Sequence, residues 1–299
     1  MSGCGTPGRL LPVLVSPEDL VRRLDDPRLR IVDTTTHLDR PEGGGRYTVR
    51  SGRPGYLTTH LPGAGFVDLA ADASDPAAPF PFALPPTRHL ARRLGGLGLG
   101  LGVHVVAYSR GDPMWATRLW WLLRYLGNDE VSVLDGGLHG WTAAGLPVET
   151  GEVALPPVRA LARPRPDLLV TLPEVLDTVH GGTAARRTRL VNALRPEVFR
   201  GEGVTSYSRP GRIPGSLNLP ADRLVDRRTG HWRDAAARRA ALTALRIDDG
   251  DTLITYCGAG ISATVPVFAW FLAGRRDVRL YDGSLAEWTA HPDLPVELG

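Results

Sequence analysis

The chain has 299 residues, which is enough for two domains of roughly 130 to 150 residues each. Its composition, 42% hydrophobic and 22% charged, is that of a folded protein. The net charge is +3, and all 35 basic side chains are arginines, scattered among 32 acidic ones without a run of five or six like charges. This pattern argues against a nucleic-acid-binding or membrane-binding patch and is compatible with a small anionic substrate.

Neither a membrane span nor a secretion signal is predicted. No stretch approaches the ~20 apolar residues that a span needs, and the early run LLPVLV is shorter than the ~7 to 15 residues of a signal-peptide core. The two cysteines, Cys4 and Cys257, lie far apart in the sequence and make a poor disulfide framework. We therefore expect a cytoplasmic protein in which Cys257 is a free thiol.

Short apolar strands and helices alternate along the first half of the chain. Strands are predicted over residues 29–35, 66–69, 103–109 and 130–136, and helices over residues 86–98, 114–127 and 138–145. The next segment, residues 150–167, contains four prolines and little periodicity, which indicates an extended linker across the surface.

The same alternation returns in the second half. Strands are predicted over residues 189–194, 216–220, 251–257 and 277–283, and helices over residues 234–246, 262–274 and 284–290. Alternation of this kind is typical of mainly parallel sheets flanked by helices, so the predicted fold class is α/β. In such sheets the ligand site lies beyond the carboxyl ends of the strands, which is where Cys257 stands.

Three segments of the first half recur in the second half, in the same order and at similar spacing. HLPGAGFVDL (60–69) recurs as RIPGSLNLP (212–220), VVAYSRGDPMWATRLWWLL (105–123) as LITYCGAGISATVPVFAWFL (253–272), and VSVLDGGLHGW (131–141) as VRLYDGSLAEW (278–288). Chance would not keep both order and spacing, so the repeat indicates a duplication. We predict an N-terminal domain over residues 10–149, a linker over 150–167 and a C-terminal domain over 168–299.

Cys257 ends a predicted strand and begins a glycine-containing loop. Gly258 and Gly260 allow consecutive backbone amides to turn toward the sulfur, and a helix follows the loop. Unpaired amides and a helix N-terminus both favour a thiolate, and they would equally stabilise an anionic persulfide. The alternative is that Cys257 is a small core residue. The loop and its strand-loop-helix setting favour a nucleophile.

The helix after the loop carries its own boundary signals. Ser262 or Thr264 is predicted to cap it, Pro266 fits only its first turn, and Gly274 is predicted to close it.

Several of these motifs resemble the two-domain rhodanese family, the thiosulfate and 3-mercaptopyruvate sulfurtransferases. They are YCGAGISAT, the pair HLPGA and RIPGS, and the pair LDGGLHGW and YDGSLAEW, and the resemblance covers roughly residues 12 to 298. It implies two tandem rhodanese-like domains, with Ser109 in place of the active cysteine in the first and Cys257 in the second. The site would open into the cleft between the domains.

The resemblance also implies a double displacement. Cys257 would take a sulfane sulfur from thiosulfate or 3-mercaptopyruvate and pass it from a persulfide to cyanide, a thiol or thioredoxin. No metal or organic cofactor is implied.

By the same resemblance, the active-site loop consists of Gly258, Ala259, Gly260, Ile261, Ser262 and Ala263. The loop carries no charge, which favours 3-mercaptopyruvate over thiosulfate as the donor. Ala259, however, stands where the mercaptopyruvate pattern has a serine whose hydroxyl assists proton transfer. A low rate with 3-mercaptopyruvate is one expected consequence.

The stretch from residue 194 to 216 resembles the substrate-binding segment of the family. Arg200 and Arg209 are the candidates for binding an anionic donor, because an arginine donates paired hydrogen bonds to a carboxylate. Val198 stands where an arginine is common, and Asn192 where an aspartate is common, so either Arg200 or Arg195 substitutes or the donor differs. The alternative is that these arginines are solvated loop residues.

In the first half, His60 matches a family histidine that approaches the cleft, and it is a candidate proton relay, with a structural cap as the alternative. Asp135 and Asp282 are expected to accept hydrogen bonds from backbone amides rather than to take part in chemistry. Trp115 is expected in the core or as a wall of the site.

Two rival functions share some of these features. A related phosphatase would need an arginine to grip phosphate after the cysteine, and residues 258–270 contain none. The other rival is a noncatalytic sulfur carrier or persulfide sensor that acts with a protein partner, which Ala259 and the altered arginine segment favour mildly.

Overall fold

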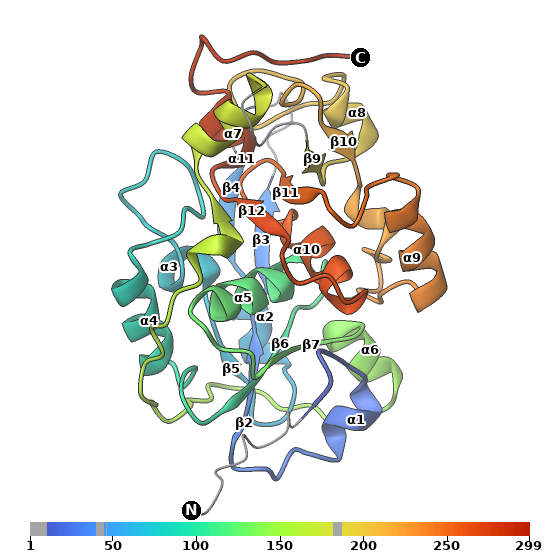
Figure 1. Ribbon diagram of the computed structural model, residues 1–299. Coiled ribbons are helices and arrows are strands. Elements are labelled where there is room, and N and C mark those ends of the chain that lie inside the picture. The colour runs from blue at the N-terminus through green and yellow to red at the C-terminus, as the bar shows by residue number, and fades with distance from the viewer. Residues whose placement is uncertain (1–10, 40–44, 46, 182–186) are drawn as a thin grey trace, which may run out of the picture.

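Two five-stranded sheets form the framework of the protein, and each is built from parallel strand pairs. The computed structural model describes residues 11–39, 45, 47–181 and 187–299 (Figure 1). The first sheet contains, in spatial order, β1 (Leu14–Val15), β7 (Val131–Leu134), β6 (His104–Tyr108), β2 (Leu29–Asp33) and β5 (Gly65–Phe66). The second contains β8 (Leu169–Val170), β12 (Arg279–Tyr281), β11 (Thr252–Tyr256), β9 (Thr188–Asn192) and β10 (Leu217–Asn218). The predicted α/β class is confirmed.

The two sheets have the same topology and register. Each strand of the first has a counterpart at the same place in the second, and β6 and β11 are the central strands. Strand β2 pairs with β6 from Leu29 opposite His104 to the end of both strands, and β9 pairs with β11 in the same way. The duplication seen in the sequence therefore extends to strand order. Ser109 and Cys257 follow directly after the two central strands.

The helices predicted from the sequence are present. They are α4 (Thr87–Gly96), α5 (Met114–Tyr125), α6 (Gly137–Ala143), α9 (Ala235–Thr243), α10 (Thr264–Leu272) and α11 (Ser284–Trp288). The structure also contains helices that were not predicted: α1 (Pro17–Val21), α2 (Arg53–Thr58), α3 (Leu69–Asp72), α7 (Leu172–Val179) and α8 (Pro196–Phe199). The strand predicted over 66–69 ends early because Asp68 caps α3, accepting hydrogen bonds from the amides of Ala70 and Ala71.

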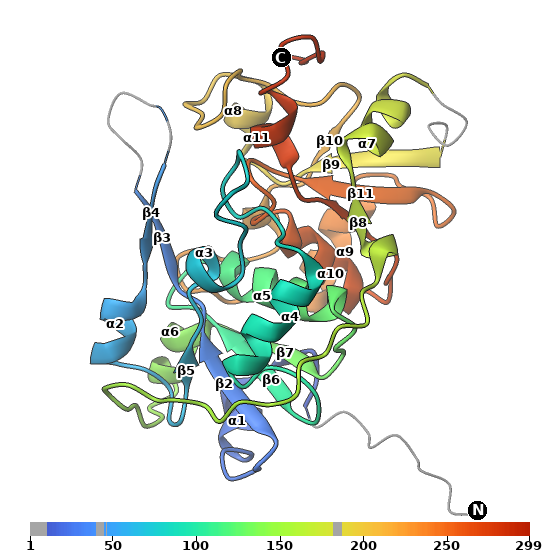
Figure 2. The same ribbon diagram turned by 90° about the vertical axis from the view of Figure 1, so that its left-hand side faces the viewer.

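An antiparallel hairpin, β3 (Thr36–Asp39) and β4 (Thr48–Ser51), was not predicted. Figure 2 shows it standing beside the first sheet and extending toward the second half. Leu38 pairs directly with Val49, so both side chains lie on the same face of the hairpin.

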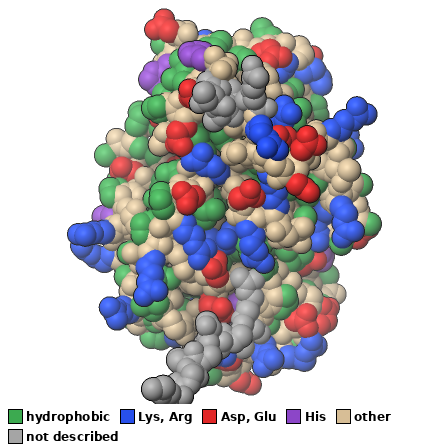
Figure 3. Space-filling view, viewed as in Figure 1, with side chains coloured by type: hydrophobic (Ala, Val, Ile, Leu, Met, Phe, Trp, Pro, Cys, Tyr) green, Lys and Arg blue, Asp and Glu red, His purple; other side chains and the backbone are tan. Residues whose placement is uncertain are grey.

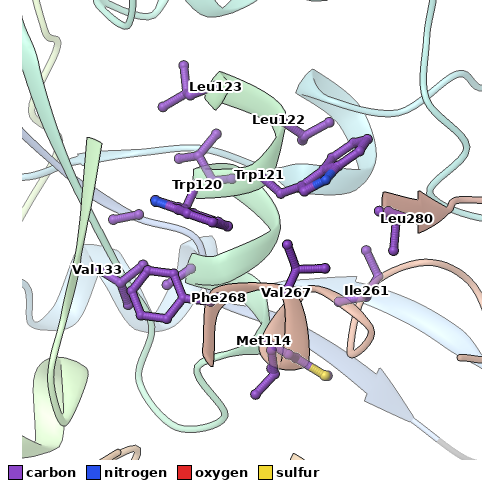
Figure 4. Packing of buried hydrophobic residues seen from close by; sticks show 14 of the residues in the cluster. Met114, Trp120, Trp121, Leu122, Leu123, Val133, Ile261, Val267, Phe268 and Leu280 are labelled. Atoms are coloured by element: carbon purple, nitrogen blue, oxygen red, sulfur yellow. The ribbon is translucent and has the colours of Figure 1, made fainter. Parts of the chain in front are cut away.

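Helices α5 and α10 join the two halves through one apolar cluster that includes residues of both (Figure 4). Trp120 of α5 packs edge-on against Phe268 and Phe271 of α10, with ring centroids 4.8 and 5.2 Å apart. Thr117 and Thr264 are counterparts in the aligned repeat, and their hydroxyl oxygens lie 2.7 Å apart. Like positions of the two copies thus meet, as they do in a symmetric dimer.

The predicted linker is extended. Residues 152–165 contain no helix or strand, and the amides of Arg163 and Arg165 donate to carbonyls at the end of α5 and just after it. The linker is thereby held against the first half. The domain boundaries at residues 10–149 and 168–299 stay a prediction.

Figure 3 shows basic and acidic side chains intermingled over one face of the molecule. No helix in the described part of the chain is long and apolar enough to span a membrane.

Candidate functional site

Cys257 lies at the wall of a cavity of about 870 Å³. Only 2% of the residue is exposed, and its thiol is free. Gly258, Ala259, Ile261 and Ser262 line the same cavity, so most of the predicted loop reaches the site. Cys4 lies outside the described residues.

Two members of the predicted loop do not line the cavity, namely Gly260 and Ala263. Gly260 has a φ of +72°, and a Cβ added there would stand 2.6 Å from the carbonyl oxygen of Asp282. This position therefore requires glycine for the tight turn of the loop. Ala263 is fully buried and precedes α10 as its N-cap residue.

The loop leaves several backbone amides without acceptors. Among the described residues, no group accepts a hydrogen bond from the amides of Gly258, Ala259, Ile261 or Ser262. At the start of α10, the amides of Thr264 and Val265 donate to the carbonyls of Ile261 and Ser262, and Pro266 has no N–H, so the free donors beside Cys257 are the four amides of the loop. These amides are available to an anion at Cys257, as the cradle predicted from the sequence requires.

Neither predicted cap of α10 acts as one. The Thr264 hydroxyl donates to the carbonyl of Ile261 over 2.7 Å, and Ser262 makes no side-chain hydrogen bond with the described residues. Its hydroxyl is therefore free to act within the cavity. Pro266 lies in the first turn, and Gly274, with a φ of +98°, follows the end of the helix as predicted.

Ser284, which was not singled out from the sequence, ties the loop together. Its hydroxyl oxygen accepts hydrogen bonds from the amides of Cys257 and Gly260, over 3.0 and 3.1 Å, and donates to the carbonyl of Tyr281. Ser284 has a φ of +50°, a left-handed backbone conformation that residues other than glycine rarely adopt. Its counterpart is Gly137, so the contrast between YDGS and LDGG was the available signal.

Two arginines line the cavity, and both belong to the second half. Arg195 precedes α8, is about half exposed at 48%, and pairs with Glu197 over 3.2 Å. Arg227 forms an ion pair with Asp112 of the first half. Within the described lining of the cavity, these two arginines are the cations that can bind an anionic donor.

Arg200 and Arg209, the primary candidates from the sequence, do not line the cavity. Arg200 pairs with Glu202 over 2.7 Å, at the far end of α8. Arg209 donates to the carbonyl of His291 over 2.8 Å. The structure therefore brings Arg195, named with Arg200 as a possible substitute for the arginine missing at Val198, to the cavity and leaves Arg200 and Arg209 outside it.

His60 is also outside the cavity. It is fully buried, its Nδ1 lies 2.9 Å from the carbonyl oxygen of Leu61, and its Nε2 lies 3.2 Å from that of Gly151. Its ring stacks on Tyr56, with centroids 4.5 Å apart. The geometry fits the structural alternative and not a proton relay.

The first half lacks an equivalent reactive loop. Ser109 is buried and donates to the carbonyl of Asp112 over 2.9 Å. Arg110 follows it where the second half has Gly258, and its guanidinium donates to the carbonyl of Gly55 over 2.6 Å. The residue after Ser109 thus carries a long side chain bonded within its own half, where the second half has a glycine after Cys257.

A sequence model described as "Rhodanese-like domain" matches residues 16–144 and 194–291. The chain belongs to the rhodanese family. This rhodanese is 33% identical to the 3-mercaptopyruvate sulfurtransferase of Escherichia coli K12 over 287 residues, which are 95% of this chain and 97% of the relative. It is 30% identical to the human 3-mercaptopyruvate sulfurtransferase over 305 residues, 97% of each chain.

The fold agrees with these similarities. The crystal structure of SseA from Escherichia coli matches with a TM-score of 0.79 at 32% identity, covering 91% of this rhodanese and 98% of SseA. Because its sulfurtransferase relatives cover nearly the whole chain, the protein is a sulfurtransferase enzyme.

In this rhodanese, side chains of the first half also hold the Cys257 loop of the second half in place. The guanidinium of Arg118, from α5, pairs with Asp282 over 2.6 Å and donates to the carbonyl of Gly260 over 3.3 Å. Asp282 accepts a further hydrogen bond from the amide of Leu84, and Asp135 accepts one from the amide of Trp232. Both aspartates bind backbone amides, as expected, but of the opposite half.

Behind Cys257, burial raises the pKa of Tyr256 to about 12. Its hydroxyl therefore stays protonated near neutral pH and donates to the hydroxyl oxygen of Ser216 over 2.7 Å. Tyr256 thus packs the site without serving as a base. Trp115 is buried against Phe82, with ring centroids 5.7 Å apart, and it is Phe82 that lines the cavity.

Proposed function

We propose that this sulfurtransferase takes sulfur from 3-mercaptopyruvate, holds it as a persulfide on Cys257 and passes it to a thiol acceptor. The Cys257 thiolate attacks the donor sulfur, the carbon–sulfur bond breaks, and pyruvate leaves with a proton. The acceptor thiolate then attacks the outer sulfur, and Cys257 returns to the thiolate. Cyanide would replace the thiol in an assay.

One observation carries the proposal: Cys257 lines the cavity on a loop in which the amides of Gly258, Ala259, Ile261 and Ser262 have no acceptor in the described part of the chain. A buried cysteine that only packed the core would need neither feature. Free amides stabilise the charge of the attacking thiolate and of the persulfide, which is the species that must survive between the two half-reactions.

The choice of donor rests on the charges around the loop. Residues 258–263 carry no charge, and Arg195 and Arg227 line the cavity to bind a carboxylate. Two relatives that match nearly the whole chain are named 3-mercaptopyruvate sulfurtransferases. Thiosulfate is the competing donor, and it would use the same arginines.

Ser262 supplies a hydroxyl that Ala259 lacks. It lies in the same loop, lines the cavity and has no hydrogen-bond partner among the described residues. We assign to it the proton transfer at the leaving enolate or at the cysteine.

The cellular setting is also part of the proposal. A thiol acceptor such as thioredoxin and a free Cys257 both require a reducing compartment, which favours the cytoplasm. A noncatalytic carrier is less well supported, because the sulfurtransferase relatives span the whole chain.

The direct experiment compares kcat/KM for 3-mercaptopyruvate and thiosulfate with cyanide as the common acceptor. We expect 3-mercaptopyruvate to be preferred. A higher value for thiosulfate would reverse the donor assignment. A single loading of sulfur without turnover would instead support the noncatalytic sulfur carrier.

A further inference from the structure

The cavity beside Cys257 is much larger than the proposed donor. Its volume is about 870 Å³, within the range of about 300 to 1,000 Å³ that holds drug-sized ligands. A three-carbon acid fills a small part of such a space. In a double displacement the donor product leaves before the acceptor binds, so the rest of the cavity is open to the acceptor.

The wall contributed by the first half is apolar. Hairpin β3–β4 places Leu38 and Val49 on the cavity from the same face of the hairpin. Further apolar side chains of the first-half wall are Ala70, Pro76, Ala78, Pro79, Phe80, Pro81, Phe82 and Met114. Tyr47 and Ser74 also line it, and the Ser74 hydroxyl donates to the carbonyl of Leu69. One acid, Asp75, is the charged side chain that this half adds to the described lining.

This wall is stiff before any ligand binds. Three prolines stiffen the loop from Asp75 to Ala83, and the amide of Asp75 donates to the carbonyl of Ala83 over 2.9 Å to close it. Phe82 has a φ of +61°, and its carbonyl accepts a hydrogen bond from Arg118 over 2.8 Å. A bulky residue held in this rare conformation at a cavity wall is the kind of strain that collects at functional sites.

The second half contributes the polar part. Its polar side chains are the two arginines, Thr205, Ser206, Ser208 and Ser262, beside smaller apolar ones such as Leu194, Val198 and Ile261. The Tyr207 ring lies beside the Cys257 loop, 3.7 Å from where a Cβ on Gly258 would stand. Val204, 51% exposed, also lines the cavity and extends its apolar lining to solvent. Cys257 and the mainly apolar wall of the first half thus line the same cavity.

We propose, resting on the proposed function, that the sulfur acceptor is a low-molecular-weight thiol with an aromatic or branched aliphatic body. Its body packs on the wall of Leu38, Val49, Phe80 and Phe82 while its thiolate attacks the outer sulfur of the Cys257 persulfide. The sulfur–sulfur bond to Cys257 breaks, a new one forms on the acceptor, and the cysteine recovers its thiolate. The exchange needs no outside oxidant or reductant.

The test separates loading from discharge. The enzyme is loaded with 3-mercaptopyruvate, desalted, and mixed with 2-phenylethanethiol or 2-mercaptoethanol, two alkyl thiols of similar acidity that differ in the apolar body. Burial of the ring predicts a second-order discharge rate at least about tenfold higher for 2-phenylethanethiol. Equal rates, or a faster discharge by reduced thioredoxin than by 2-phenylethanethiol, would overturn the inference.

A matched variant locates the effect. Phe80 is half-buried, and Phe80→Ser is expected to reduce the ratio of the two rates by several-fold, whereas Leu101→Ser, at an exposed leucine outside the cavity, leaves the ratio unchanged. An unchanged ratio in Phe80→Ser contradicts the assigned wall. Cyanide discharge of the loaded variant shows that it is folded. If the wild type forms no persulfide, both the proposed function and this inference are wrong. If it forms a persulfide that both thiols discharge at the same rate, only this inference is wrong.

Discussion

At the scale of single residues, the proposed mechanism places the chemistry on Cys257 and on the neighbouring hydroxyl of Ser262. Cys257→Ser keeps a side chain of similar size but removes the thiolate, so we expect a loss of turnover greater than about 1,000-fold with an unchanged fold. Steady-state kinetics and circular dichroism measure the two properties. Turnover at the wild-type level would remove Cys257 from the mechanism.

Ser262→Ala tests the proton-transfer role. Because Ala259 has no hydroxyl, removal of the Ser262 hydroxyl leaves the loop without one. We expect kcat with 3-mercaptopyruvate to fall by about 10 to 100-fold with little change in KM. A change confined to KM would show that Ser262 binds the donor instead.

Arg195 and Arg200 form a matched pair, since both are exposed and each pairs with a nearby glutamate. Arg195 lines the cavity and Arg200 does not. We expect Arg195→Gln to raise KM for 3-mercaptopyruvate by about tenfold and Arg200→Gln to leave it unchanged. A raised KM in Arg200→Gln and an unchanged KM in Arg195→Gln would show that Arg200, the residue favoured by the sequence, binds the donor.

At the scale of elements, the turn before α11 depends on Ser284. Ser284→Ala and Ser284→Gly both remove the acceptor for the amides of Cys257 and Gly260, so both should lower kcat. Only glycine relieves the left-handed conformation, so the glycine variant should be the more stable by about 1 kcal/mol. Urea unfolding measures the difference. An alanine variant of equal or greater stability would contradict the reading of this turn.

Most elements of the fold were predictable because apolar periodicity, glycine and proline mark them locally. The four inner and edge strands predicted in each sheet, six helices and the Cys257 loop followed from such signals, whereas the two-residue edge strands β1 and β8 were not predicted. The β3–β4 hairpin was missed because its polar stretch, TTTHLD, resembles a loop, although it carries Leu38 to the cavity. The choice among Arg195, Arg200 and Arg209 was beyond sequence reasoning, since the packing of α8 decides which of them faces the cavity.

At the scale of the whole molecule, the two halves are joined by a buried ion pair next to the reactive loop. Arg118→Met leaves Asp282 buried without its cation, which should lower the unfolding free energy by about 3 to 5 kcal/mol and reduce kcat through the loss of the bond to Gly260. The double variant Arg118→Met/Asp282→Asn removes the unpaired charge and should recover part of the stability. A double variant no more stable than the single one would contradict this account.

An ion pair, in addition to backbone hydrogen bonds, holds the linker to the first half. Arg165 of the linker donates to Asp129 and lowers the pKa of that carboxyl to about 2. An aspartate with a lowered folded pKa stabilises the fold above its unfolded pKa of about 3.9, and this contribution is lost as the pH falls toward 2. Asp129→Asn should therefore destabilise the protein slightly at pH 6, and the difference should shrink below pH 4. A difference independent of pH would rule out the charge contact as its cause.

The most direct test of the central claim is mass spectrometry of the peptide that contains Cys257, after the enzyme has been mixed with stoichiometric 3-mercaptopyruvate. The proposed mechanism predicts a gain of one sulfur atom on Cys257, formed at least as fast as turnover and removed by cyanide. No gain on that peptide, or a gain on Cys4 instead, would contradict it.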